Sequence, residues 1–281
     1  MTSNKEERED IAGKDYWNTQ WASIALPTSL WNIDSKHFRD SVERKLFAHM
    51  RDCFERHLGP TKGKRLLEIG CAHSCVLPLF YLKSGFEIYG IDYSDLGCSQ
   101  TRMILLREHV PGIVICCDLF NPPEQFVGHF DAVLSLGVVE HFTDTQAVVT
   151  AMAKLLRPGG VLFTHIPNMT GLTGLAQRLL DRSTFEKHMQ IEIGELHLAH
   201  VSSGLDVVSC NYFMSINLGV ANIGGIPRST LEWTLKRGAL TWLARVTNLV
   251  WLTEQYFGEF PVSRLFSPYI NCVAIKPAIN V

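Results

Sequence analysis

The sequence predicts an α/β fold in which a doubly wound, mostly parallel sheet of seven strands follows a helical leader and carries a helical insert before its last strand. Nearly continuous apolar runs alternate with helical patterns, which is typical of parallel strands covered by helices on both faces. The seven apolar runs are residues 65–69, 86–91, 113–117, 132–136, 161–166, 205–213 and 269–275.

The leader, residues 1–60, contains one clear helical pattern. From Ser35 onward, apolar residues recur at every fourth position as far as Leu58, and Gly59-Pro60 is a typical stop signal. We therefore expect an amphipathic helix that leads into the core, residues 61–214.

The insert, residues 215–262, is dominated by a helical pattern over residues 228–257, which we expect to be interrupted near Gly238. A helix that is apolar on two sides suggests a cap that packs on the core and on something else. The insert is therefore expected to cover the substrate or to form a homodimer contact, before residues 263–281 return to the core as its last strand. One face carries Trp242, Val246, Leu249, Val250 and Phe257, and the other carries Trp233, Leu240 and Trp251.

Composition restricts the function classes. Of the 281 residues, 46% are hydrophobic, which is enough for one large domain with an insert and argues against disorder. The 26 Lys+Arg and 28 Asp+Glu give a net charge of −2, which provides no overall attraction to nucleic acid or an anionic membrane.

Eight cysteines without a CxxC pair, and a mixed-charge run at residues 5–10, favour a reduced, cytoplasmic protein. The longest uncharged stretch, residues 207–227, contains Asn, Ser and three Gly and is a poor membrane span.

The most informative segment is a turn of small residues that starts at Gly70, directly after the first strand. Small residues let backbone N–H groups approach a ligand closely. Asp92 and Asp118 follow the next two strands, and the carboxyl ends of parallel strands line one crevice, so we expect both to converge with Glu68 on one ligand. Asp92 is suited to accept hydrogen bonds from a ribose diol, and Asp118 from an adenine amino group.

A nicotinamide-binding domain would also place an acid after its second strand, but it needs the pattern GxGxxG. Here Ala72 and Cys75 replace the second and third glycines, which disfavours a pyrophosphate cradle. An NAD(P)-dependent oxidoreductase is therefore the alternative rather than the first choice.

The pattern Glu68-x-Gly70-x-Ala72-x-Ser74 resembles the first motif of class I S-adenosylmethionine-dependent methyltransferases of the small-molecule type. Further motifs follow in the family's order over residues 64–167. They are Tyr89-Gly-Ile-Asp92-Tyr-Ser, Cys117-Asp118-Leu119, the run from Phe130 through Glu140-His141-Phe142, and Leu156-Arg-Pro-Gly-Gly160. The resemblance implies a Rossmann-like sheet with an antiparallel final pair, S-adenosylmethionine as cofactor, and methyl transfer to an oxygen or nitrogen of a small molecule.

The resemblance also implies the roles of the cofactor-binding residues. Asp92 would bind the ribose, Asp118 with Leu119 the adenine, and Ser135 would lie near the sulfonium. Gly70 and Ala72 would line the methionine portion, and Glu68 would order the loop. The full set is Glu68, Gly70, Cys71, Ala72, Asp92, Tyr93, Asp118, Leu119 and Ser135, joined by Tyr16 and Arg39 of the leader as candidates to contact the methionine carboxylate.

Methyl transfer from a sulfonium needs in-line approach, so positioning and desolvation can provide most of the catalysis. An acceptor oxygen of high pKa, or a protonated amine, also needs a base, and His141 after the fourth strand is the candidate. The substrate is expected to have an apolar or aromatic body because the insert is rich in Trp and Leu. The substrate-binding candidates are His165, Asn168, His188 and Trp21.

Other partners are disfavoured. No metal site is expected, because His197 and His200, with Glu192 and Glu195 nearby, are not part of an HExxH motif. No nucleic acid is expected, because the place where base methyltransferases of this fold carry an Asn/Asp-Pro-Pro motif reads Ser135-Leu-Gly-Val. A catalytically silent methyltransferase-like subunit that binds a partner through the insert stays open as a second alternative.

Overall fold

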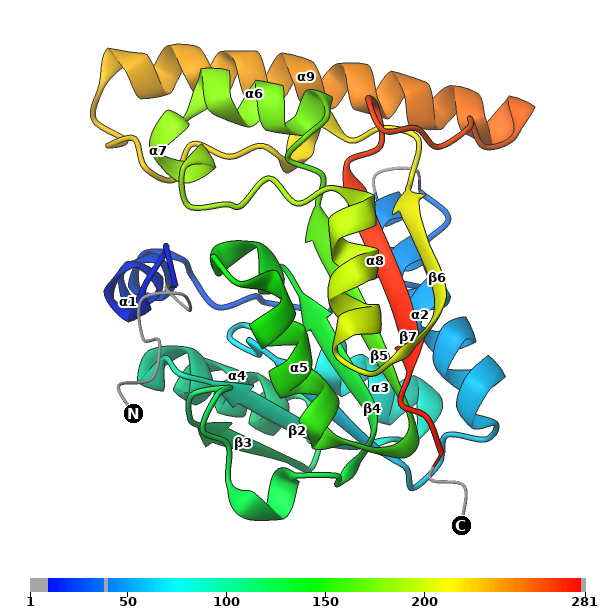
Figure 1. Cartoon of the computed structure of the whole chain (residues 1–281). Coiled ribbons are helices and arrows are strands. Elements are labelled where there is room, and N and C mark those ends of the chain that lie inside the picture. Colours follow the sequence, from blue (N-terminus) through cyan, green and yellow to red (C-terminus); the bar gives the residue numbers. More distant parts are fainter. Residues whose placement is uncertain (1–9, 38–39, 279–281) are drawn as a thin grey trace.

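The computed structural model describes residues 10–37 and 40–278. Its strands are β1 (Arg65–Ile69), β2 (Glu87–Asp92), β3 (Gly112–Cys116), β4 (Phe130–Leu136), β5 (Leu156–Pro167), β6 (Asp206–Phe213) and β7 (Tyr269–Ile275). In this part of the chain the seven strands form one sheet in the order β3-β2-β1-β4-β5-β7-β6 (Figure 1). Strands β1 to β5 are parallel to one another, whereas β7 runs antiparallel between β5 and β6. The predicted fold class is confirmed.

Helices cover both faces of the sheet. They are α1 (Lys14–Ser23), α2 (Ser41–Leu58), α3 (Val76–Ser84), α4 (Asp95–Arg107), α5 (Thr145–Leu155), α6 (Leu172–Leu180), α7 (Arg182–Phe185), α8 (Ile193–Ser202) and α9 (Leu231–Phe257), with short 3₁₀ turns η3 (Glu124–Phe126), η4 (Val139–His141) and η5 (Leu218–Val220). Phe47, Phe54 and Phe80 lie in the apolar cluster that joins α2, α3 and α4 to one face. Met152 and Leu196 lie in the cluster that joins α5 and α8 to the other. The carboxyl ends of the central strands remain accessible beyond these layers.

Helix α2 begins later than its apolar pattern predicted. The helix starts at Ser41 rather than Ser35, because the preceding segment forms its own turn, in which the Ser35 N–H donates to the Asn32 carbonyl at 3.2 Å. The apolar stripe itself is buried as expected, since Met50 and Phe54 are fully enclosed. The helix therefore packs within the core layer instead of standing apart from it, and the division of the chain into leader, core and insert stays a prediction.

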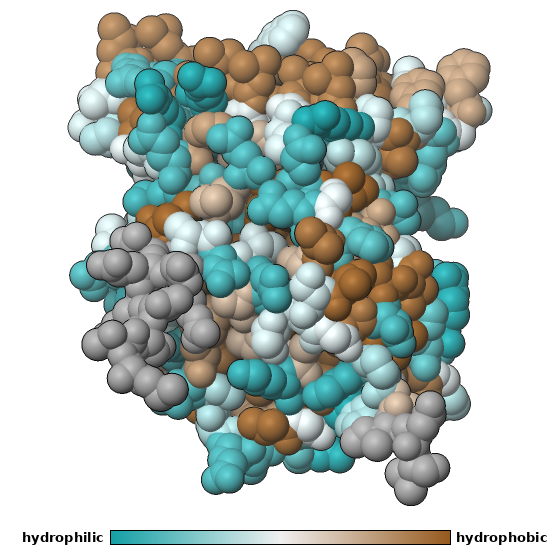
Figure 2. All heavy atoms as spheres, in the orientation of Figure 1, coloured by the Kyte–Doolittle hydropathy of each residue, from teal (hydrophilic) through white to brown (hydrophobic). Residues whose placement is uncertain are grey.

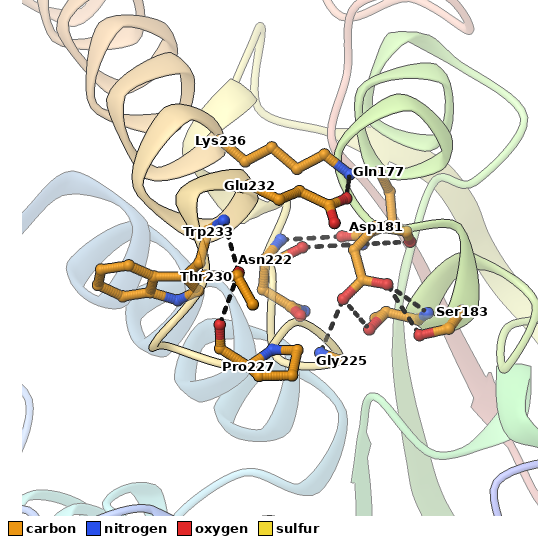
Figure 3. Close-up of polar contacts among 11 residues, drawn as sticks. Gln177, Asp181, Ser183, Asn222, Gly225, Pro227, Thr230, Glu232, Trp233 and Lys236 are labelled. Atoms are coloured by element: carbon orange, nitrogen blue, oxygen red, sulfur yellow. Dashed lines mark hydrogen bonds and ion pairs between the residues drawn. The ribbon is translucent and has the colours of Figure 1, made fainter.

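Helix α9 is continuous over 27 residues, so the predicted interruption near Gly238 is wrong. A single glycine costs a helix only about 1 kcal/mol relative to alanine, which the other 26 residues and the N-cap outweigh. Thr230 forms that cap, accepting the Trp233 N–H at 3.1 Å (Figure 3).

The two sides of α9 have different environments. Trp251, on the inner side, is 6% exposed and donates its indole N–H to the Ile216 carbonyl at 2.9 Å. The outer side carries exposed apolar residues, and Figure 2 shows hydrophobic surface along the top of the molecule where α9 lies. We call this the α9 stripe, and it consists of Leu231, Leu235, Trp242, Leu249 and Tyr256. None of the helices in the described part of the chain combines the length and the hydropathy that a membrane span requires.

A polar network attaches the loop before α9 to α6 and α7 (Figure 3). The Gln177 side chain pairs with the backbone of Asn222 in both directions, accepting its N–H and donating to its carbonyl, each at 2.9 Å. Asp181 accepts the Gly225 N–H at 2.7 Å and the Ser183 hydroxyl at 2.9 Å. Because Gln177 and Asn222 also line a cavity, this network shapes the wall of the site.

Candidate active site

Two adjoining cavities open at the carboxyl ends of the central strands. The first, the loop cavity, is lined by the turn after β1 together with Asp92, Tyr93 and Trp21. The second, the histidine cavity, is lined by residues that include His141, His165, His188, Glu140 and Tyr269. The wall that the two cavities share contains Trp17, Trp31, Leu136, Gly137 and His141. The shared residues place the two cavities on either side of the β4 carboxyl end.

The turn after β1 needs glycine at its first position. Gly70 has φ +70°, a left-handed conformation that side chains disfavour, and a Cβ there would lie 2.6 Å from Cγ2 of Val138. The backbone can therefore approach β4 closely and leave room in the loop cavity. Ala72 and Ser74, the small residues that replace two glycines of the family motif, both line this cavity.

Asp92 lies at the end of β2 with its carboxylate in the loop cavity. It accepts the backbone N–H of Ser94 at 2.7 Å and that of Ala72 at 3.2 Å. Burial raises the pKa of Asp92, while these two hydrogen bonds act in the opposite direction. The turn after β1 and the end of β2 are thus joined through an acceptor that faces the cavity.

Glu68 lies beneath the turn. Its carboxyl group accepts the Ser74 hydroxyl at 2.5 Å, and the Ser74 oxygen accepts the Leu77 N–H at 3.1 Å in the first turn of α3. Burial raises the pKa of Glu68 to about 8, so this group holds its proton at neutral pH. Glu68 is placed to order the turn rather than to carry charge into the cavity.

Helix α1 covers the loop cavity with aromatic rings. Trp17 and Trp21 are stacked at 5.4 Å between centroids, and Trp21 also stacks on His73 at 5.0 Å. The Gln100 side-chain amide donates to the Trp21 carbonyl at 3.0 Å, which ties α1 to α4. Trp21 therefore lines the loop cavity, whereas the sequence assigned it to the substrate. Trp17 and His73 were missed, because Trp17 lies in the leader outside the motifs and His73 occupies a position that the first motif leaves unspecified.

Tyr93 and Asp10 form a second link between the N-terminal segment and the sheet. Both line the loop cavity, and the Tyr93 hydroxyl donates to the Asp10 carboxylate at 2.5 Å. Asp10 also accepts the N–H groups of Ala12 and Gly13 at 2.9 and 3.0 Å, just before α1. Asp10 was not identified from the sequence because its partner is 83 residues away.

Several predicted cofactor residues do not line the loop cavity. Asp118 is exposed and its carboxylate accepts the Phe120 N–H at 3.0 Å, while Leu119 is buried in the core. Cys71 and Ser135 are fully buried beneath the site. Tyr16 lines a separate surface cavity, where the Lys187 ammonium lies 4.5 Å from its ring centroid. Arg39 lies outside the described residues.

Among the predicted substrate residues, His165 and His188 line the histidine cavity. His165 is buried, and its Nδ1 lies 2.6 Å from the side-chain oxygen of Asn271. Asn168 has a structural position instead, since it is fully buried and donates to the carbonyls of Arg264 and Ser267 at 2.7 and 2.9 Å. It ties the end of β5 to the segment before β7.

Glu140, His141 and His188 form a cluster on the wall of the histidine cavity, and His141 is the one of the three that also lines the loop cavity. Burial, assisted by the nearby His188, lowers the pKa of His141 to about 4, and burial raises the pKa of Glu140 to about 8. Glu140 was named within a motif of the sequence but was given no role in the site, because a glutamate next to a histidine gives no indication that a distant histidine completes the group.

His197 and His200 do not face a common site. His200 is buried, where its Nδ1 lies 2.8 Å from the Leu196 carbonyl and its Nε2 lies 3.0 Å from the Thr164 hydroxyl. His197 is exposed on the same helix. Both ring nitrogens of His200 are already hydrogen-bonded, so His197 is the only histidine of this pair that could bind a metal ion.

Comparisons with known proteins agree with this geometry. A family model described as a methyltransferase domain matches residues 39–209. A protein from Chromobacterium violaceum described as ubiquinone biosynthesis O-methyltransferase is 25% identical over 218 residues, which cover 77% of this chain and 77% of the relative. One with the same description from Sinorhizobium medicae is 28% identical over 179 residues, 57% of this chain and 70% of the relative. A solved magnesium protoporphyrin IX methyltransferase from Synechocystis, with bound SAH, has a TM-score of 0.59 at 13% identity and covers 95% of this chain and 100% of that chain.

Proposed function

The chain belongs to the methyltransferase domain family and is an S-adenosylmethionine-dependent methyltransferase, and from this premise we propose that it methylates an oxygen atom of a small, largely apolar molecule. The observation that carries the proposal is the junction of two cavities at His141 and Gly137. A methyl donor in one cavity and an acceptor in the other would meet there in line.

The loop cavity fits the cofactor. Asp92 presents a buried acceptor suited to a ribose diol, and the turn at Gly70 leaves space where a larger residue would collide with Val138. S-adenosylmethionine, when bound, supplies a methyl group that its sulfonium already activates. The aromatic rings of Trp17 and Trp21 exclude water from the reacting centre, which favours attack by a desolvated nucleophile.

The histidine cavity fits an acceptor with an apolar or aromatic body. Its walls combine Leu46, Met169 and Val220 with a small number of polar groups, which is typical of sites for small molecules. Both bacterial relatives are named as O-methyltransferases, and this favours oxygen over nitrogen as the acceptor atom. We retain the sequence prediction that His141 contacts and activates this acceptor.

Two further predictions from the sequence stay proposals. The first is a cytoplasmic location. The second is a contact between two copies of the chain through residues 215–262. In support of that contact, Leu235, Trp242, Leu249 and Tyr256 of the α9 stripe recur at every seventh residue, a spacing typical of paired helices.

A mass-spectrometric screen tests the proposed reaction. The purified chain is incubated with a metabolite extract and S-adenosylmethionine whose methyl group carries a heavy isotope. We expect one or a few hydroxylated apolar compounds to gain the labelled methyl group on oxygen. Transfer only to nitrogen would overturn the choice of acceptor, and an absence of transfer with intact cofactor binding would favour the silent-subunit alternative.

A further inference from the structure

We propose that Glu140, His141 and His188 bind a divalent transition-metal ion of the zinc type, which in turn binds the acceptor oxygen. One ligand atom from each of the three residues lies within 4.8 Å of the others. Glu140 and His141 belong to η4 after β4, and His188 follows α7, so the fold brings two separate segments together. The role given to the ion rests on the proposed function, whereas the binding site itself does not.

The two histidines are held in the tautomer that a metal ligand needs. Nδ1 of His141 lies 2.7 Å from the Lys187 carbonyl, and Nδ1 of His188 lies 2.8 Å from the Thr184 carbonyl. A carbonyl oxygen only accepts hydrogen bonds, so each Nδ1 carries the proton and each Nε2 keeps its lone pair. Metal-binding histidines are commonly oriented by such an outer acceptor.

The carboxylate provides a second, independent observation. Glu140 is 2% exposed, and its Oε2 has no hydrogen-bond partner among the described residues. Buried polar atoms are nearly always paired, so an unpaired oxygen beside two imidazole rings calls for a missing partner. A cation between the three groups would satisfy that oxygen and both Nε2 atoms together.

The distances are compatible with a site that closes on the ion. Zinc bonds to nitrogen and oxygen are about 2.0–2.2 Å long, so two ligands of one ion lie roughly 3–4 Å apart. The ligand atoms of the cluster all lie within 4.8 Å of one another, so a separation near that limit must shorten by about 1 Å. His188 can supply this movement, because it is only half-buried and lies in the loop between α7 and α8.

The ligand set indicates the type of metal and its chemistry. Two imidazoles with one carboxylate suit zinc, cobalt or iron(II), whereas magnesium and calcium prefer oxygen ligands. Three protein ligands leave a coordination position open on the side of the histidine cavity.

A hydroxyl group of the acceptor, held at this position, would lose its proton to water more readily, because the ion lowers the pKa of that hydroxyl. The oxygen would then form the new C–O bond while the C–S bond breaks and sulfur keeps the electron pair. In this arrangement His141 acts on the acceptor through the ion, as a ligand, and this role replaces the direct role as base that the sequence predicted.

Cobalt(II) is the probe for the site, because its visible absorption reports the ligands directly. The chain is treated with a chelator, dialysed and titrated with CoCl₂, and the same titration is repeated with the variants Glu140→Gln and His188→Gln. His197→Gln is the matched control, since it removes an exposed histidine outside the cluster. Circular dichroism verifies that each variant is folded.

We expect one Co²⁺ per chain with visible bands typical of nitrogen and oxygen ligands. Either cluster variant should weaken binding by about tenfold or more, and the control should leave it unchanged. Binding that is equal in all four proteins, or no binding to the wild type, would overturn the proposal. Calorimetric titration of S-adenosylmethionine into the same metal-free protein separates the two claims, because the cofactor should bind there whether or not the metal does.

Discussion

The imidazole rings of His141 and His188 lie 4.6 Å apart between centroids, although one follows β4 and the other follows α7. The Met189 N–H also donates to the Glu140 carbonyl at 2.6 Å, so the loop before α8 is joined to η4 by backbone as well as by side chains. This loop is therefore part of the wall of the histidine cavity. A change at His188 should alter the acceptor site without disturbing the turn at Gly70.

Asp92→Asn should weaken cofactor binding. The amide keeps the shape of the carboxylate but removes one acceptor from a buried site, at a cost of about 1–3 kcal/mol, or roughly 5- to 150-fold in affinity. Isothermal titration with S-adenosylmethionine measures the change. Asp118→Asn is the matched comparison, and because Asp118 is exposed and outside the loop cavity we expect a much smaller effect. Equal losses in both variants would support the sequence prediction that Asp118 binds the adenine.

Gly70→Ala should destabilise the fold and weaken cofactor binding together. The positive φ costs an alanine about 1–2 kcal/mol, and the contact of its Cβ with Val138 at 2.6 Å adds to this. Urea unfolding measures the loss. Adding Val138→Ala should recover the steric part of the cost and leave the backbone part. If Gly70→Ala unfolds at the same urea concentration as the wild type, the strained turn is not as described.

Glu68→Gln should change how stability depends on pH. The pKa of Glu68 is raised from its ordinary value of 4.5 to about 8, so the folded state keeps a proton that the unfolded chain releases. This contribution to stability is fully present below about pH 4.5 and is lost as the pH rises towards 8, by up to about 1.4 kcal/mol per pH unit. Urea unfolding between pH 5 and 8 should therefore show a weaker decline in the variant. Parallel curves for the two proteins would contradict a buried, protonated Glu68.

Replacement of two tryptophans of α9 should change stability by very different amounts. Trp251 is 6% exposed, and Trp251→Ala should cost about 3–5 kcal/mol through lost burial and the lost hydrogen bond to Ile216. Trp242 is 63% exposed, and Trp242→Ser should change stability by less than about 0.5 kcal/mol. Chemical unfolding of both variants provides the comparison.

The same Trp242→Ser variant tests the contact between two copies. If the α9 stripe pairs with itself, sedimentation equilibrium should show a dimer for the wild type and a larger monomer fraction for the variant. A wild type that stays monomeric at every concentration would remove the proposed contact.

The strands could be predicted because their apolar runs are short, buried and separated by turns, and the bounds of β1 and β7 match those runs. The continuity of α9 could not be predicted. Gly238 is exposed with nothing within 4 Å of its missing Cβ, so it neither packs nor breaks the helix, and a local pattern cannot distinguish these cases.

The site residues that follow strand ends could be predicted from the sequence. Those that belong to the leader, or to the helices and loops after β5, could not. Gly70, Ala72 and Asp92 line the loop cavity because the ends of parallel strands converge by topology. Trp17 and Gln177 reach the cavities only through the packing of α1 and α6, which leaves no periodic signal. The grouping of Glu140 with His188 has the same origin.

A crystal structure with S-adenosylhomocysteine bound tests most directly the claim that donor and acceptor meet between the two cavities. We expect the ribose hydroxyls on Asp92, and the sulfur at the shared wall beside Gly137 and His141, facing the histidine cavity. A sulfur atom directed away from His141, or a cofactor bound in the histidine cavity, would contradict this account.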